Sequence, residues 1–155
     1  MYSIIVKFDL EGYHRWPNAP EEYKMLRSKH NHNFRFEAEI PVDEDITNAS
    51  GRALEILDVR RTLECSVVNE YGDKTPYEVG VFLKWEPHVC NFRALSCELL
   101  AESLAKTIRE LYYVDPIKVV VMEDEFVGAS FVPDVLNNRE VEALKKSAIE
   151  LIGGR

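Results

Sequence analysis

Three histidines near the start of the chain are the residues whose type and spacing suggest chemistry. His14, His30 and His32 are three of only four histidines, and all lie in the first quarter of the sequence. An imidazole nitrogen is a good zinc ligand, and three such ligands leave one coordination position for water or a substrate. The pattern therefore predicts a metal site. Two histidines at H-x-H spacing also fit ordinary packed side chains.

The run that contains His30 and His32 has the pattern of a half-buried strand. From Phe34 to Ile40, apolar and charged residues alternate, and both histidines share the parity of the apolar set. Two imidazoles on a buried sheet face are costly unless their ring nitrogens find partners. A bound metal ion would satisfy them.

Two glutamates lie at the ends of predicted elements. Glu98 falls in the first turn of a helix that begins after Ser96, and Glu123 follows an apolar run over residues 117–122. Binding groups often gather at such places on a rigid scaffold. Each carboxylate also fits an ordinary role, as a favourable first-turn charge for Glu98 and as an exposed strand end for Glu123.

The elements that must position these residues are predicted from alternation and turn signals. A first strand covers residues 2–9, and the prolines at 17 and 20 predict a loop that lifts His14 clear of it. Residues 23–29 carry a basic cluster and fit a solvated connection. The strand with His30 and His32 is expected to end near residues 41–42.

The rest of the chain predicts two internal helices, two more strands and a C-terminal helix. Residues 53–57 fit an extended strand, and Asp58 is the expected N-cap of a helix carrying apolar residues at spacings of four. Residues 77–85 fit a helix or a strand. The predicted apolar stripe of the helix after Ser96 consists of Leu100, Leu104, Ile108 and Leu111. The last elements are the strand over 117–122, a returning strand over 129–132 and a helix over 141–151.

This order predicts one α+β domain over residues 1–155, with a largely antiparallel sheet and helices on one face. Nineteen basic and 27 acidic residues give a net charge of −8, which argues against a nucleic-acid partner and against reading His-Asn-His as a nuclease motif. No apolar run is long enough to span a bilayer. The three cysteines lack metal-binding spacing, so reduced thiols in a cytoplasm are expected.

Taken together, these motifs resemble the 6-pyruvoyl-tetrahydropterin synthase and 6-carboxy-tetrahydropterin synthase family. The likeness runs in order from about residue 2 to 132 and leaves out the C-terminal helix. The motifs that carry it are His14-Arg15-Trp16-Pro17, His30-x-His32-x-Phe34, Ile56-Leu57-Asp58, Ser96-Cys97-Glu98-Leu99-Leu100-Ala101, and Glu123 followed by Gly128.

The resemblance implies the tunnelling fold, a four-stranded antiparallel sheet with two helices on one face, in subunits that assemble into a homo-oligomer. It implies that His14, His30 and His32 bind zinc. It also implies that Glu98 and Glu123 lie at the site of a small pterin-type substrate. A carboxylate accepts two parallel hydrogen bonds from the amino-pyrimidinone edge of such a ring.

The chain departs from the family in its proton-transfer groups. The family carries a catalytic cysteine shortly before the H-x-H pair, where this chain has Met25 or Leu26, and the usual glycine between the histidines is Asn31. His88 and Cys90 are the candidates to replace the missing base. Loss of a general base removes roughly 10²–10⁴-fold of rate.

The sequence therefore favours a zinc-dependent lyase that acts on a dihydroneopterin triphosphate-type substrate. Two alternatives remain open. The first is a paralogue of the same fold that binds a pterin or purine without this chemistry or with a different reaction. The second is a structural oligomer whose histidines are merely packed.

Overall fold

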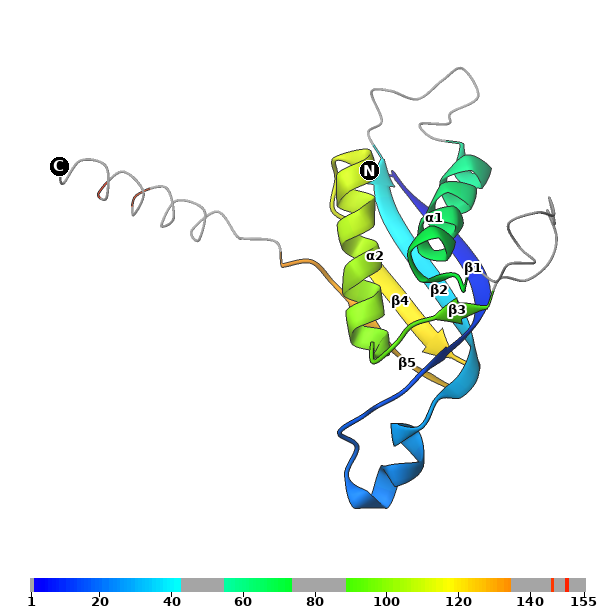
Figure 1. The fold of residues 1–155 in the computed structure, drawn as a ribbon. Helices are drawn as coiled ribbons and strands as arrows, with labels where there is room; N and C mark the ends of the chain where they lie inside the picture. The colour runs from blue at the N-terminus through cyan, green and yellow to red at the C-terminus, as the bar shows by residue number, and fades with distance from the viewer. Residues whose placement is uncertain (1, 43–54, 74–88, 135–145, 147–149, 151–155) are drawn as a thin grey trace.

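The computed structural model describes residues 2–42, 55–73, 89–134, 146 and 150, which form one sheet with helices packed on it (Figure 1). In chain order the elements are β1 (Tyr2–His14), the 3-10 helix η1 (Glu21–Arg27), β2 (His30–Val42), α1 (Ile56–Tyr71), β3 (Cys90–Asn91), α2 (Cys97–Tyr112), β4 (Lys118–Glu123) and β5 (Val127–Phe131).

The described strands form a five-stranded sheet in the order β3-β1-β2-β4-β5. β1 pairs with β2, β2 with β4 and β4 with β5, all antiparallel, which confirms the largely antiparallel sheet. The predicted count of four strands misses β3, which pairs with β1 in parallel. A strand of two residues is too short to show an alternating pattern, so the sequence gives no sign of it.

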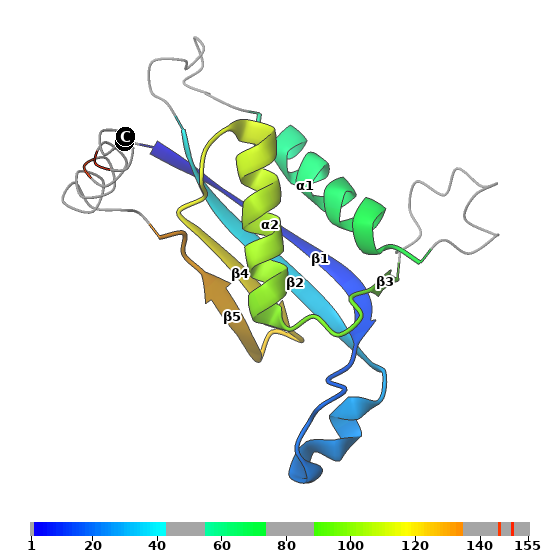
Figure 2. The ribbon, with the colours of Figure 1, turned by 60° about the vertical axis from the view of Figure 1, so that its left-hand side comes forward.

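Both α-helices cover the same face of the sheet, as the two views show (Figures 1 and 2). Phe8 of β1, Phe34 and Phe36 of β2, Leu63 of α1 and Leu100 of α2 are almost fully buried in one core cluster. η1 projects beyond the sheet at the end where β1 and β2 are joined (Figure 2), and Tyr23 of η1 stacks on Trp16 with 6.4 Å between ring centroids. The predicted α+β arrangement is therefore confirmed.

The first strand is longer than predicted, and the expectation that a loop lifts His14 clear of it is wrong. β1 continues to His14, because Leu10, Gly12 and His14 keep the inward parity of the strand. The prolines at 17 and 20 act only on the residues around them, so the chain leaves the sheet after His14. The predicted end of β2 near residues 41–42 is confirmed.

The start of α1 also differs from the prediction. Residues 56 and 57, expected to extend a strand, lie in the helix, and residues 53–54 lie outside the described part of the chain. The N-cap is Glu55, whose side chain accepts a hydrogen bond from the Leu57 amide, and Asp58 is in the first turn. Asp58 favours the helix start through its charge instead of through capping.

The helix after Ser96 begins as predicted, because the Ser96 side chain accepts a hydrogen bond from the Leu99 amide. Its apolar stripe is confirmed except at Leu111, which is 44% exposed near the helix end. The returning strand begins at Val127, two residues earlier than expected. The segment 77–85 and almost all of the C-terminal helix predicted over 141–151 lie outside the described residues.

Gly12 lets the chain after β3 pack closely against β1. A Cβ atom at this position would lie 2.5 Å from the Phe92 ring and 3.1 Å from the Cys90 carbonyl oxygen. Phe92 is fully buried and packs against Phe34 and Phe36. A side chain at position 12 would therefore displace the segment that leads into α2.

We expect Gly12→Ala to lower the free energy of unfolding by about 1–3 kcal/mol, the usual effect of overpacking a core. Urea denaturation followed by circular dichroism measures it. Glu11→Ala, one residue away and exposed, is the matched control and should leave the midpoint almost unchanged. Equal midpoints for Gly12→Ala and the wild type would contradict this account of Phe92 packing.

Candidate metal site

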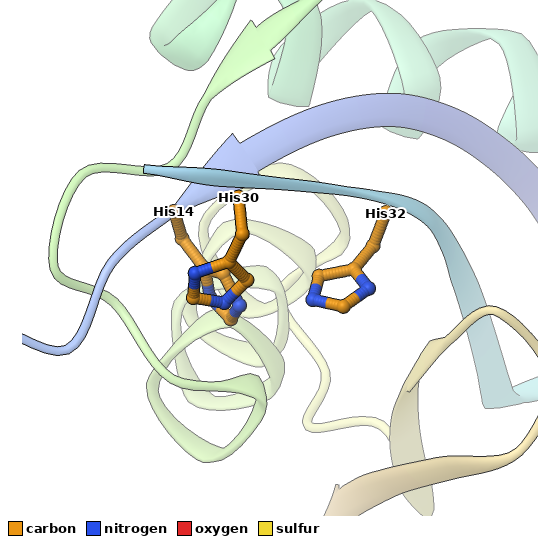
Figure 3. Close-up of side chains that lie close together, drawn as sticks. All are labelled: His14, His30 and His32. Atoms are coloured by element: carbon orange, nitrogen blue, oxygen red, sulfur yellow. The ribbon is translucent and has the colours of Figure 1, made fainter. Parts of the chain in front are cut away.

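The register between β1 and β2 brings the three histidines together. His14, the last residue of β1, pairs with His30, the first residue of β2, and His32 pairs with Gly12. All three side chains project from the same face of the sheet (Figure 3). The inward projection of His30 and His32, predicted from their parity with Phe34, is confirmed.

The three imidazoles are close enough to share one ion. One ring nitrogen from each lies within 4.8 Å of the corresponding nitrogens of the other two. The ring centroids of His14 and His30 are 4.6 Å apart, and those of His30 and His32 are 5.1 Å apart. His14 is buried, at 8% exposure, and the other two are half-buried.

Each histidine also has an oxygen acceptor for its Nδ1 atom. His14 Nδ1 lies 2.9 Å from the Leu95 carbonyl oxygen, and His30 Nδ1 lies 2.9 Å from the Ser28 carbonyl oxygen. A carbonyl can only accept, so both rings donate through Nδ1–H. In a neutral imidazole this leaves Nε2 with a free lone pair, the arrangement found in metal-binding histidines.

Asp124 gives His32 the same arrangement. Its Oδ2 atom lies 2.5 Å from His32 Nδ1, and its Oδ1 atom accepts a hydrogen bond from the Asn33 amide at 2.8 Å. These bonds lower the pKa of Asp124, with His32 as the main cause, so the carboxylate accepts and Nδ1 donates. The sequence analysis missed Asp124, although the pairing of Phe34 with Glu123 places it opposite Asn33.

Glu123 faces two of the ring nitrogens that the Nδ1 acceptors leave free. One carboxylate oxygen lies 3.1 Å from His14 Nε2, and the other lies 3.5 Å from His32 Nε2. The His14 hydrogen bond is the main reason why the pKa of Glu123 is lowered. A carboxylate facing two nitrogen lone pairs requires a positive charge between them, supplied by an added proton or by a metal ion.

The electrostatics of His14 agree with this requirement. Burial by itself would lower its pKa, but the hydrogen bonds to Glu123 and Leu95 and the Glu123 charge together raise it. The positively charged form of the ring is therefore favoured against Glu123. A bound cation would take the place of that proton, since metal ligation requires the neutral imidazole.

Cys97 is a neighbour of this site that the sequence analysis did not single out. Its Sγ atom donates to Glu123 at 3.5 Å from the first turn of α2. Burial is the main cause that raises the pKa of Cys97 to about 12, and the Glu123 charge adds to it. The thiol is therefore protonated at neutral pH in this arrangement. In the sequence, Cys97 follows the predicted N-cap Ser96 and precedes the candidate Glu98, and this position could have marked it as a site residue.

Of the other predicted site residues, the structure describes Cys90 and Glu98. Cys90 lies in β3, fully buried in the hydrophobic core, and burial is the main cause that raises its pKa to about 11. Glu98 is exposed in the first turn of α2, one residue from Cys97. His88 lies outside the described residues. The roles assigned to these residues stay predictions.

The donor set fits a metal ion. Three imidazoles whose Nδ1 atoms are held by oxygen acceptors can, in their neutral form, each present Nε2 to one ion, as metal-binding histidines do. Among the described residues, this is the group of histidine, cysteine and acidic side chains whose ligand atoms come close enough together to hold an ion.

Comparisons with known proteins support the fold. No protein-family model matches this sequence, and no curated protein matches it. The structure is similar to 6-pyruvoyl tetrahydropterin synthase from Caenorhabditis elegans, with a TM-score of 0.54 and 16% identity over 86% of this chain and 96% of that chain. It is also similar to an uncharacterised protein from Wolinella succinogenes, with a TM-score of 0.50 and 13% identity over 86% of this chain and 98% of that chain. At this identity the likeness shows the fold alone: the chain has the tunnelling fold of a tetrahydropterin synthase.

Proposed function

We propose that this chain is a zinc-dependent lyase, similar to tetrahydropterin synthases, that acts on a dihydroneopterin triphosphate-type substrate. The observation that carries the proposal is the set of three imidazoles whose Nδ1 atoms are held by Leu95, Ser28 and Asp124. This leaves three Nε2 lone pairs free to bind one ion. The shared fold with the Caenorhabditis elegans enzyme agrees with the proposal.

His14, His30 and His32 would hold the ion. Bound zinc supplies Lewis-acid chemistry, since it lowers the pKa of a hydroxyl group that it binds. The backbone acceptors of His14 and His30 would keep both rings in the tautomer that presents Nε2. Asp124 would do the same for His32 from the turn between β4 and β5.

Glu123 and Glu98 would bind the ring of the substrate. In the structure the Glu123 carboxylate is engaged with His14 and His32. When a cation takes the Nε2 lone pairs, the carboxylate no longer has imidazole protons to accept. It can then accept the paired N–H groups of an amino-pyrimidinone edge. Glu98, exposed at the start of α2, would contribute from the same end of the helix.

The proposed proton-transfer group differs from the cysteine that the family uses. Met25 or Leu26 stands at the place of the family's cysteine; both lie in η1, and neither side chain can take a proton. His88 and Cys90 stay the proposed replacements, and the buried Cys97 is the thiol in contact with Glu123. Because neither Met25 nor Leu26 can take a proton, the second candidate function is a protein of the same fold that binds a pterin or purine without this chemistry or with a different reaction.

The proposal also includes a cytoplasmic location and assembly into a homo-oligomer. Among the described residues, no helix is both long and apolar enough to cross a bilayer. All three cysteines are free thiols, which supports the proposed cytoplasmic location, where thiols stay reduced. A homo-oligomer is proposed from the resemblance to the family, with a small pterin-type molecule as the ligand and no nucleic-acid partner.

We expect the purified protein to bind about one zinc per chain and His30→Ala to lose it. Asp124→Asn should weaken zinc binding by roughly 10–100-fold, the usual effect of removing the acceptor behind a ligating histidine. Asp9→Asn, which changes an acid that pairs with Arg35 away from the site, is the matched control. Elemental analysis and competition with a chelating dye measure the affinities. Zinc-free wild type with unchanged stability in His30→Ala would contradict the metal site.

We expect Glu123→Gln to keep its zinc and to bind neopterin about 10–100-fold more weakly, because the amide replaces one of two charged acceptors with a donor. Fluorescence titration of zinc-loaded protein measures the affinity. Glu125→Gln, in the adjoining turn, should bind neopterin like the wild type. If Glu123→Gln instead loses zinc, Glu123 is a metal ligand and its role in ring binding is wrong.

The zinc-loaded protein should convert dihydroneopterin triphosphate and release inorganic triphosphate, the leaving group when the carbon–oxygen bond breaks. We expect slow turnover, reduced by about 10²–10⁴-fold from an enzyme with an intact general base, because Met25 and Leu26 cannot take a proton. Chromatography of the pterin products and of the released triphosphate measures it. Bound zinc with no product would support the second candidate function in place of the lyase.

A further inference from the structure

The acceptor that holds His14 comes from neither of the strands that carry the histidines. It is the Leu95 carbonyl oxygen, 2.9 Å from His14 Nδ1, and Leu95 lies in the segment between β3 and α2. This segment runs past the end of β1 (Figure 2). The conformation of this segment therefore affects which ring nitrogen of His14 is left for a metal ion.

A tight turn over residues 92–95 directs this carbonyl group. The Leu95 amide donates to the Phe92 carbonyl oxygen at 3.0 Å, and Arg93, at the first central position, has a φ angle of 57°. Ala94, at the second central position, is not among the described non-glycine residues with positive φ. This is the pattern of a type II′ turn, in which glycine is usual at the first central position. An arginine is strained there.

Contacts on both sides hold Arg93 in this conformation. Its amide donates to the Asn91 side-chain oxygen at 3.0 Å, and its carbonyl oxygen accepts from the Arg15 amide at 2.9 Å. Its guanidinium lies over the Tyr71 ring, with 5.9 Å between the guanidinium carbon and the ring centroid. Strained residues persist only where surrounding contacts hold them in place, and they cluster at functional sites.

Tyr71 gives the guanidinium a fixed surface to lie on. It is the last residue of α1, is 6% exposed, and has its hydroxyl 3.2 Å from the Ser103 hydroxyl of α2. Its ring also packs against Phe92, with 5.3 Å between the ring centroids. The side chain of Arg93 is thus connected to the packing of both helices.

We propose that Arg93 is a positioning residue for the candidate metal site. Its left-handed backbone directs the Leu95 carbonyl oxygen at His14 Nδ1, and its contact with Tyr71 stabilises that backbone. With Nδ1 engaged, Nε2 of His14 is the nitrogen left to bind an ion. The consequence for zinc rests on the proposed function, whereas the hydrogen bond that Arg93 positions is present without a metal.

Three substitutions separate the backbone of Arg93 from its side chain. Arg93→Gly adopts a positive φ without strain and should bind zinc like the wild type. Arg93→Ala, which keeps the strain and loses the guanidinium, should weaken zinc binding by about 2–5-fold, the range for a surface cation–π contact. Arg93→Val, which is β-branched and poorly tolerated at positive φ, should weaken it by roughly 10–100-fold.

Ala94→Val is the matched control. It places the same β-branched side chain one residue away, at an exposed position without a positive φ, and should bind zinc like the wild type. Competition with a chelating dye measures the zinc affinity of each variant. Circular dichroism confirms that each variant is folded.

A second measurement needs no metal. Nitrogen-15-edited NMR of histidine-labelled, metal-free protein detects the His14 Nδ1 proton, which the hydrogen bond to Leu95 protects from exchange with water. We expect a protected proton in the wild type, in Arg93→Gly and in Ala94→Val, and faster exchange in Arg93→Ala and Arg93→Val.

Retention of the protected proton in Arg93→Val would overturn the inference. Its loss in Arg93→Gly would do the same, because the backbone conformation would then not be what places Leu95. Equal loss in Ala94→Val would show only crowding of the turn and would also overturn it. A wild type that binds no zinc but shows the expected NMR differences rejects the proposed lyase and keeps the positioning role. Zinc binding with a His14 proton unaffected by Arg93→Val does the reverse.

Discussion

The pairing register of β1 and β2 is the constraint on which the rest of the site depends. It places the last residue of one strand, His14, opposite the first residue of the next, His30. A shift of one residue would turn the histidines of one strand to the opposite face of the sheet. The register is fixed far from the histidines, because Phe8, Phe36 and the other inward residues of both strands are buried under the helices. Core packing therefore determines the geometry of the three histidines.

The same register distributes charge around the site. The β2–β4 pairing puts Glu123 and Asp124 on one side of the histidines, where their carboxylates contact ring nitrogens. The turn between β3 and α2 adds the Leu95 carbonyl oxygen behind His14. A cation bound by the histidines would thus have carboxylates next to it, and the acceptors behind the rings would keep Nε2 directed at it.

The sequence predicted those parts of the fold and site that follow from local patterns. Alternation placed His30 and His32 on the inward face, and the Ser96 cap located the start of α2. The sequence did not predict the contacts between segments that are far apart in the chain. Asp124 receives its role only from the antiparallel pairing with Asn33, and Arg93 comes near Arg15 only through β3, a strand of two residues. Neither pairing leaves a periodic signal in the chain.

Two features of the site did not follow from sequence patterns: the position of His14 and the identity of the base. The prediction of a loop at His14 was wrong because proline restricts only its own φ and the conformation of the residue before it. The prolines at 17 and 20 therefore leave His14 free to continue β1. The likeness to the Caenorhabditis elegans enzyme, at 16% identity, shows the fold and does not identify a catalytic base. Here three imidazoles have defined acceptors at Nδ1 and a carboxylate at the opposite edge, an arrangement that is electrostatically complete only with a positive charge among them.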